Sequence, residues 1–327
     1  MLRIYIYLFV LSMLLGLFFI SIFKRLVLRI HKLITNGIPL VGGISIGSTF
    51  LITVLMGFSL IGQMDKKIWG IIFASLFMLL SGIYDDLKTI SIFNKFFLQI
   101  IATFILVIFG IKTEIVGIGQ IPNLLITFLW IIGITNAFNH LDIMDGLCGG
   151  VGFWIGLAFL IISFLNHQIN VSILTLAFLG ALLSFLRYNL PPARVYLGNC
   201  GSHFLGFILS AQAIILSYAT IEKKAALLTP ILILGYPIYD TSFLILMRLR
   251  NRRPIFRKSK DHLALKFLNR GYSVKRIIAY LYLLSILFCI CGILVSQLPN
   301  LLSISLIVIM SLFILILTLK FLKFSDA

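Results

Sequence analysis

Long apolar runs alternate with short polar segments along nearly the whole chain of 327 residues. A helix needs about 17 to 25 apolar residues to cross a bilayer, and eleven runs come near this length. They lie near 4–23, 44–62, 68–84, 96–111, 123–139, 152–165, 171–186, 203–219, 227–247, 277–295 and 301–319. The pattern predicts an all-α, polytopic integral membrane protein with about eleven transmembrane helices in a single domain over residues 1–327.

The composition agrees with a membrane protein and changes what its partners are expected to be. The chain is 61% hydrophobic and 11% charged, whereas ordinary soluble domains carry about 25% charged residues. The net charge of +17 raises the question of nucleic acid. Basic residues that alternate with membrane spans are better explained by orientation and by anionic lipids or substrates. We therefore expect the lipid bilayer and anionic ligands as partners, and no nucleic acid.

The basic residues also predict an orientation. With the N-terminus outside, the inner segments hold 21 of the 27 Lys and Arg residues, as the positive-inside rule requires. This places the C-terminus in the cytoplasm. The inner segments are 24–43, 85–95, 187–202, 248–276 and 320–327. The largest of them, 248–276, is a basic cytoplasmic loop in which a short interfacial helix is predicted from His262 to Leu268.

The same threading gathers most carboxylates on or near the inner face. They are Asp85, Asp86, Asp142, Asp145, Asp240, Asp261 and Asp326. Such one-sided clustering favours a reaction centre, because a channel or transporter more often carries ionisable groups near the bilayer midplane. A transporter of lipid-linked sugars remains an alternative.

The stretch from Asn136 to Gly146 is the most polar part of any apolar segment. Its polar residues recur every three positions at 136, 139, 142 and 145. Steps of three drift by about 60° around a helix, so Asn139, Asp142 and Asp145 are expected to line one edge of a pocket, with Gly146 ending the helix. Ordinary helix capping is the alternative for each residue taken singly.

Two further segments offer candidate chemistry. Adjacent carboxylates at Asp85 and Asp86 repel each other unless one holds a proton or a cation lies between them, and Mg²⁺ suits such oxygen ligands. A solvated helix end is the alternative. In the segment 187–202, glycines permit close backbone approach to a ligand and Ser202 is expected to cap the next helix; a simple tight connection is the alternative. Gly42-Gly43 is expected to serve helix packing, with a phosphate contact as the alternative.

Five motifs, in this order, resemble those of the polyprenyl-phosphate N-acetylhexosamine-1-phosphate transferase family, glycosyltransferase family 4 of bacterial cell-envelope synthesis. The resemblance covers residues from about 37 to 273 and is closer to the UDP-N-acetylglucosamine branch than to the phospho-muramyl-pentapeptide branch. The motifs are Pro39-Leu-Val-Gly-Gly43, Asp85-Asp86-Leu87 with Lys95, Asn136 to Gly146, Arg194-Val-Tyr-Leu-Gly-Asn199-Cys-Gly-Ser202 and Pro237-Ile-Tyr-Asp240-Thr241.

The resemblance implies a Mg²⁺-dependent enzyme, with Mn²⁺ as an alternative, in the bacterial plasma membrane with its active site facing the cytoplasm. It would transfer a sugar 1-phosphate from a UDP-sugar to polyprenyl phosphate, such as undecaprenyl phosphate, and release UMP. A homodimer is left open. The implied catalytic residues are Asp85, Asp86, Asp142 and Asp145, and the metal ligands are Asp85, Asp86, Asp142 and Asn199. The expected substrate-binding residues are Lys95, Asn139, Arg194, Tyr196 and His262.

Two positions depart from the family pattern. Asn199 stands where the family usually has an aspartate that ligates the metal, and an amide oxygen ligates Mg²⁺ without the charge of a carboxylate. His262-Leu-Ala-Leu265 stands where the N-acetylglucosamine branch has a sequence like His-Leu-His-His. These departures motivate two alternatives: a catalytically degenerate membrane paralogue that binds lipid phosphate or regulates a relative, and the phospho-muramyl-pentapeptide transferase activity.

Overall fold

A computed structural model describes residues 1–30, 32–61, 64–216, 218, 223–252, 254 and 262–323. The chain divides into two compact units, Met1–Leu216 and Ser217–Ala327, and each unit is described by itself. Asp261, Asp326 and the part of the predicted basic loop at 253 and 255–261 lie outside the described residues. The expectation of one domain over the whole chain stays a prediction.

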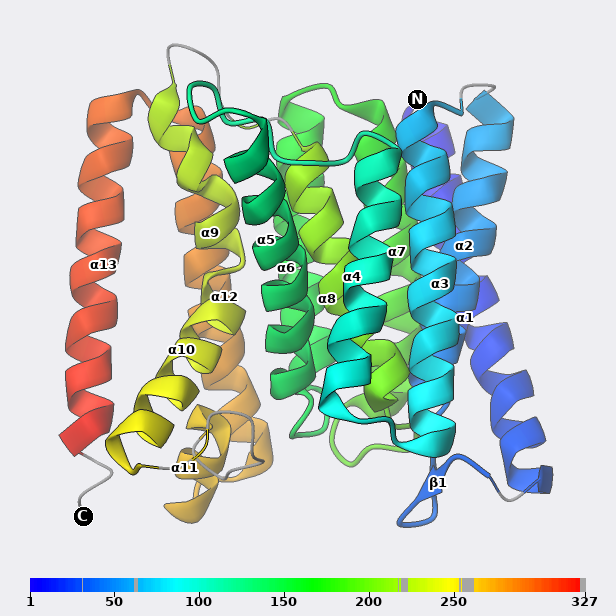
Figure 1. The fold of residues 1–327 in the computed structure, drawn as a ribbon. Helices are drawn as coiled ribbons and strands as arrows, with labels where there is room; N and C mark the ends of the chain where they lie inside the picture. The colour runs from blue at the N-terminus through cyan, green and yellow to red at the C-terminus, as the bar shows by residue number, and fades with distance from the viewer. Residues whose placement is uncertain are drawn as a thin grey trace. The chain divides into compact units, whose positions relative to one another are not determined.

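The first unit is a bundle of helices that alternate in direction along the chain (Figure 1). The ends of α3 and α5 and the beginnings of α4 and α8 consequently share one end of the bundle. We call this the acidic end, defined by Asp85, Asp86, Asp142 and Asp145. The helices are α1 (Leu2–Ile30), α2 (Gly42–Ile61), α3 (Lys66–Lys88), α4 (Ile92–Ile108), α5 (Gln120–Leu141), α6 (Leu147–Leu165), α7 (Ile169–Asn189) and α8 (Gly198–Ile215).

Helix α8 is buried along almost its whole length and packs against α2, α3, α5 and α6. Small residues allow the closest approaches. A Cβ added to Gly43 of α2 would lie 2.2 Å from the backbone nitrogen of Gly201, and one added to Gly82 of α3 would lie 2.5 Å from the Cα of Cys200. Since neither position has room for a side chain, the prediction that Gly43 serves helix packing is confirmed.

A small hairpin precedes α2 and departs from a purely helical fold. Strands β1 (Ile34–Thr35) and β2 (Ile38–Pro39) pair antiparallel around Asn36-Gly37, whose φ angles of 50° and 77° suit the tight turn that Asn-Gly favours. Beyond the hairpin, Tyr196 donates its N–H to the carbonyl of Pro39 at 2.9 Å. A hydrogen bond between backbone groups therefore joins two of the sequence motifs, those that contain Pro39 and Tyr196.

The second unit contains η1 (Lys224–Leu228), α9 (Thr229–Ile233), α10 (Gly235–Arg250), α11 (Leu263–Asn269), α12 (Val274–Gln297) and α13 (Asn300–Lys323). The segment Lys224–Ile233 meets α10 at a bend of 69°. Helix α11 confirms the short helix predicted after His262.

Every predicted apolar run overlaps a helical segment, so the helical, multi-pass prediction is confirmed. Within the described ranges, eight helices are long and apolar enough to cross a membrane, or up to nine if the bent pair is one span. Helix α4 is shorter, at 17 residues, and the 18 residues of α8 include polar Asn199 and His203. The count of eleven spans stays a prediction.

Candidate active site

Asp86 is held by the first turn of α8. Its two carboxylate oxygens accept the backbone N–H groups of Asn199 at 2.8 Å and Cys200 at 3.1 Å. The first N–H groups of a helix have no partner within the helix and carry partial positive charge, so a carboxylate is favoured there. Gly198 permits this approach, because its φ is +75° and a Cβ would lie 2.6 Å from Asp86 Oδ2.

Asp85, its neighbour, has different partners. Its Oδ2 lies 2.6 Å from Lys95 Nζ, and its Oδ1 accepts the N–H of Ile90 at 3.1 Å. The Asp85 side chain is 1% exposed and that of Lys95 is 22% exposed. The ion pair joins the last turn of α3 to the first turn of α4, and it explains how two adjacent carboxylates coexist: one is balanced by an ammonium group and the other by helix N–H groups.

Asn139 of α5 joins the same part of α8. Its Nδ2 donates to Asn199 Oδ1 at 3.3 Å and to Ser202 Oγ at 3.0 Å. Helix α8 begins at Gly198, with Leu197 as its N-cap, so Ser202 lies inside the helix. The prediction that Ser202 caps this helix is therefore wrong, and its hydroxyl instead connects α8 to α5.

The loop after α5 carries the other two predicted aspartates. Helix α5 ends at Leu141, and Gly146 is the N-cap of α6 with a φ of 79°. The prediction that Gly146 ends the preceding helix is wrong, because its left-handed conformation begins the next one. Asp145 Oδ2 accepts the N–H of Ala193 at 3.0 Å, and Asn189 Oδ1 accepts the N–H of Gly146 at 2.9 Å. These bonds fasten the loop to the segment before α8.

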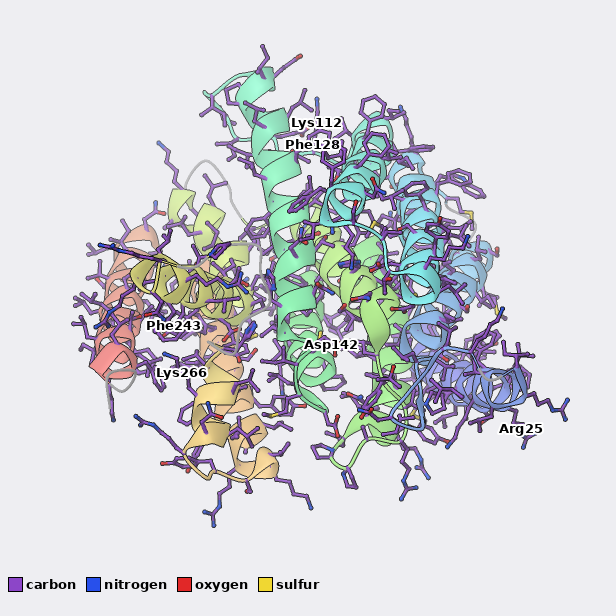
Figure 2. All side chains as sticks on the ribbon, turned by 60° about the horizontal axis from the view of Figure 1, so that its bottom comes forward. Arg25, Lys112, Phe128, Asp142, Phe243 and Lys266 are labelled. Carbon is purple, nitrogen blue, oxygen red and sulfur yellow. The ribbon has the colours of Figure 1, made fainter. Side chains whose placement is uncertain are left out.

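Asp142 is the exposed member of the acidic end. It follows α5 at the end opposite to Lys112 (Figure 2). Lys112 lies outside the predicted inner segments and Asp142 is predicted on or near the inner face, so the two residues are expected on opposite sides of the membrane. Desolvation by the surrounding protein, followed by the negative charges of Asp86 and Asp145, raises the pKa of Asp142 to about 7. Its surface is nevertheless open to solvent. A cation can therefore reach the Asp142 carboxylate. The negative charges of the nearby aspartates favour a cation beside it.

Arg194 and Tyr196 lie on the segment between α7 and α8. Arg194 is exposed and its N–H donates to the carbonyl of Tyr188 at 2.7 Å. Tyr196 is partly buried, and its carbonyl accepts the N–H of Gly42 at 3.0 Å. The backbone of this predicted substrate-binding segment is thus fixed at several points, while the roles of the two side chains stay predictions.

His262 lies in the second unit. Its Nδ1 is 3.0 Å from Asp240 Oδ2, and the other Asp240 oxygen accepts the N–H of Leu263 at 3.3 Å. Both side chains are buried. The motif around Asp240 therefore holds the residue that begins α11. The substrate-binding role of His262 stays a prediction.

His203 is a candidate that the sequence interpretation missed. It follows Asn199 by four residues in α8, so both lie on one helix face, and it is 5% exposed. A cavity of about 10 Å³ lies beside it, also lined by Asp85, Lys95 and Gln99. An ionisable residue inside an apolar run marks a functional candidate by itself, and that signal could have found it.

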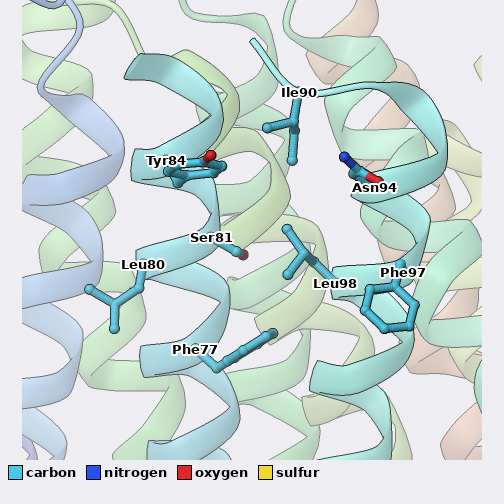
Figure 3. A pocket seen from close by; sticks show the side chains of 8 residues that line it. All are labelled: Phe77, Leu80, Ser81, Tyr84, Ile90, Asn94, Phe97 and Leu98. Carbon is cyan, nitrogen blue, oxygen red and sulfur yellow. The ribbon is translucent and has the colours of Figure 1, made fainter. Parts of the chain in front are cut away.

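An apolar groove of about 430 Å³ runs between α3 and α4 (Figure 3). It shares three lining residues with the small cavity at Lys95, namely Ser81, Ile90 and Leu98. The complete lining is Phe77, Leu80, Ser81, Tyr84, Ile90, Asn94, Phe97 and Leu98. This apolar groove thus borders the Lys95–Asp85 ion pair.

The donor atoms fit a hard cation bound together with a substrate. Within the described part of the chain, no group of three or more His, Cys, Asp or Glu side chains is placed to hold a metal ion. Mg²⁺ commonly uses one or two carboxylates, waters and substrate phosphates instead of a closed protein site. Asp86, Asp142 and the amide oxygen of Asn199 supply oxygens of this kind.

Comparison with known proteins agrees with this arrangement. The model of the family described as glycosyl transferase family 4 matches residues 68–217, which extend from α3 to the end of α8 and hold nearly all of the acidic end's bonds. This part of the chain is similar to glycosyl transferase family 4. The segment of this family thus coincides with the first unit's site and not with the Asp240–His262 pair.

Three similar proteins illustrate the range of names. The chain is 29% identical over 323 residues, covering 93% of itself and 88% of the relative, to a Bacillus subtilis protein named "Probable undecaprenyl-phosphate N-acetylglucosaminyl 1-phosphate transferase". It is 29% identical to a Mycobacterium leprae decaprenyl-phosphate N-acetylglucosaminephosphotransferase, over 62% of the chain and 58% of the relative. It is also 29% identical to a Limosilactobacillus reuteri phospho-N-acetylmuramoyl-pentapeptide-transferase, over 56% of the chain and 62% of the relative.

Proposed function

We propose that this protein transfers N-acetylhexosamine 1-phosphate, with N-acetylglucosamine as the preferred sugar, from a UDP-sugar to polyprenyl phosphate and releases UMP. This reaction would begin the membrane stage of a cell-envelope glycan. The observation that carries the proposal is the convergence of Asp86, Asn139 and Asn199 through direct hydrogen bonds, within the segment matched by the family. The names of the Bacillus and Mycobacterium relatives support the substrate classes.

The proposed chemistry is attack by an oxygen of the lipid phosphate on the β-phosphorus of the nucleotide sugar. A new P–O bond forms there, and the bond between the β-phosphorus and the bridging oxygen breaks with its electron pair going to UMP. A phosphate monoester has its second pKa near about 6, so the nucleophile is already largely dianionic at neutral pH. The protein therefore needs to align two anions more than it needs to supply a base.

Positive charge must offset the repulsion between the two substrates. Lys95 has three N–H donors and shares one face of its ammonium group with Asp85, so it can also donate to a phosphate. We propose that Arg194, which is exposed on the segment before α8, binds a second phosphate. Mg²⁺, when bound, would neutralise pyrophosphate charge, and we propose Asp86, Asp142 and Asn199 as its protein ligands.

The surroundings of Asp85 and Asp86 favour direct attack over a covalent intermediate. Asp85 is paired with Lys95 and almost fully buried, and both oxygens of Asp86 accept N–H groups. Each feature lowers the nucleophilicity of the carboxylate. Incubation with the UDP-sugar without lipid acceptor should yield no phosphoryl-sugar adduct by intact mass spectrometry; trapping such an adduct on either aspartate would establish the two-step route.

The groove between α3 and α4 is the surface that we propose for the first isoprene units of the acceptor. Its lining is apolar apart from Ser81, Tyr84 and Asn94, and it borders the cavity that contains Lys95. A prenyl chain in the groove would bring its phosphate toward the ammonium group. We further propose that the acidic end faces the cytoplasm, where UDP-sugars are available, in keeping with the basic inner segments.

The deciding experiment measures UMP release by the purified protein with undecaprenyl phosphate and a panel of UDP-sugars, with Mg²⁺, Mn²⁺ or EDTA. We expect turnover with UDP-N-acetylglucosamine and its loss in EDTA. Turnover only with UDP-N-acetylmuramoyl-pentapeptide would assign the alternative transferase activity, and no turnover with any donor would favour the degenerate paralogue.

Asn199→Asp tests whether this chain's own variant is a lesion or a working ligand. The carboxylate can accept the same N–H of Asn139 while adding charge, so we expect the Mg²⁺ concentration for half-maximal activity to fall about tenfold. If Asn199→Asp also raised the maximal activity strongly, the result would support the degenerate paralogue, the alternative that the amide at position 199 motivates.

A further inference from the structure

The cavity beside His203 contains an arrangement that the proposed reaction does not explain. Within the described residues, His203 Nε2 has no hydrogen-bond partner. The residue is buried, with only 5% of its surface exposed, so bulk water does not supply one. A buried polar atom without a partner costs about 1–3 kcal/mol, so nearly all such atoms in proteins meet another polar group or an ordered water.

The cavity supplies the place for such a water. Its volume of about 10 Å³ corresponds to one water molecule, and a buried water needs two to four polar partners. Asp85, Lys95 and His203 all line it. The other two polar residues of the lining already have partners: Gln99 Oε1 accepts the Nδ2 of Asn136 at 2.7 Å, and Ser81 Oγ donates to the carbonyl of Met78 at 2.9 Å.

We propose that His203 is a positioning residue for Lys95, and that it acts through one water molecule bound among His203 Nε2, Lys95 Nζ and Asp85. The water accepts an N–H of the ammonium group and exchanges a hydrogen bond with the imidazole, which serves in either tautomer because water both donates and accepts. With one N–H directed to Asp85 and one to the water, the third N–H of Lys95 has a fixed direction toward the substrate phosphate.

This inference rests on the proposed function, since it assigns Lys95 a substrate phosphate. It adds a residue from α8 to an ion pair formed by α3 and α4. The same two turns of α8 would then hold Asp86 through backbone N–H groups, Asn139 through side chains and Lys95 through water, so one helix would set all three.

The test compares His203→Leu, which removes the polar atom, with His203→Gln, which keeps an amide able to reach the water. Gln212→Leu is the matched control, because Gln212 lies in the same helix, is 1% exposed and also has a buried side-chain nitrogen without a partner among the described residues. We expect kcat to fall roughly tenfold or more in His203→Leu, as for loss of a hydrogen bond to a charged group. His203→Gln should recover most of it, and Gln212→Leu should retain wild-type activity.

A double-mutant cycle separates positioning from a structural role. In a Lys95→Met background, His203→Leu should cause no further loss of kcat, because the group that it positions is already absent. A full tenfold loss in that background, or a His203→Gln variant as impaired as His203→Leu, would overturn the proposal.

A second measurement does not depend on the reaction. A high-resolution experimental structure should show one water within hydrogen-bond distance of both His203 Nε2 and Lys95 Nζ in the wild type and none in His203→Leu. If the wild type releases no UMP with any donor, the proposed function fails. The presence or absence of this water then decides the positioning role by itself, and a wild-type cavity without water would overturn the positioning role.

Discussion

The two ends of the first unit satisfy their polar groups in different ways. At the end opposite to the acidic end, Asp65 caps its own helix by accepting the N–H of Ile68, and Asn123 bonds Ile115 and Gly119 within one connection. A long-range bond there, from Asn170 to Asp65, is exposed.

At the acidic end, the polar groups bond across large sequence separations. Asp86 and Asn199 are 113 residues apart, Asn139 and Ser202 are 63 apart, and Asp145 and Ala193 are 48 apart. Local capping stabilises a helix end and needs nothing else, whereas convergence of distant segments fixes side chains relative to one another. Both ends of this bundle are polar, and this difference in bonding distinguishes a candidate active site from a set of capped helix ends.

The largest expected effect separates the two ends directly. Asp86→Ala should lower transferase activity by about 10²- to 10³-fold, and should reduce the free energy of unfolding by about 1–3 kcal/mol because two N–H groups of α8 lose their acceptor. The activity is measured as UMP release and the stability by thermal unfolding in detergent.

Asp65→Ala is the control for that change at the opposite end. Loss of a helix N-cap costs about 1 kcal/mol and should leave activity intact. Equal losses of activity in the two variants would remove the distinction between the ends.

The next effect concerns the Lys95–Asp85 ion pair. Lys95→Met should destabilise the protein by about 3 kcal/mol, since it leaves a buried carboxylate without its counter-charge; this lies at the low end for buried pairs because Lys95 is partly exposed. The double variant Lys95→Met with Asp85→Asn should regain most of the stability but none of the activity that Lys95→Met loses. A Lys95→Met variant with wild-type stability and activity would contradict both roles of the lysine.

The smallest effect tests the packing that brings α8 to the site. Gly43→Ala forces a Cβ against the backbone of Gly201 and should cost about 1–3 kcal/mol, as overpacking usually does. Gly133→Ala in α5 has open space around its Cβ and should stabilise the helix by about 0.5–1 kcal/mol. Thermal unfolding of both variants checks the pair, and a Gly43→Ala variant as stable as Gly133→Ala would contradict the close approach.

Much of the fold could be predicted because it follows from local patterns. Apolar runs of membrane-spanning length located the helices, and the side of Asp142 relative to Lys112 followed from alternating direction. The hairpin was missed although Asn36-Gly37 is a strong turn signal, because membrane-length periodicity outweighed it. Gly146 was assigned to the wrong helix because a glycine in the left-handed region can end one helix or begin another.

The pairing of the site residues was beyond the sequence for a physical reason. The residue types at 85, 86, 139 and 199 predicted oxygen-rich chemistry, but not that the backbone of Asn199 would bind Asp86 while its side chain meets Asn139. Backbone donors leave no trace in side-chain identity. His203 was missed although an ionisable residue inside an apolar run is itself a signal; that it shares a cavity with Asp85 and Lys95 could not be predicted, because those residues come from two other helices.

Because backbone N–H groups hold Asp86, substitutions at the residues that supply these groups can leave its hydrogen bonds in place. Any residue except proline supplies the same N–H at positions 199 and 200, so those side chains can diverge, as the asparagine and cysteine here do, without releasing the carboxylate. The geometry restricts Gly198 by its left-handed backbone and limits the size of the side chain at position 200, where Cys200 is 1% exposed. A family could in this way vary the chemistry that faces its substrates while the backbone that holds Asp86 stays unchanged.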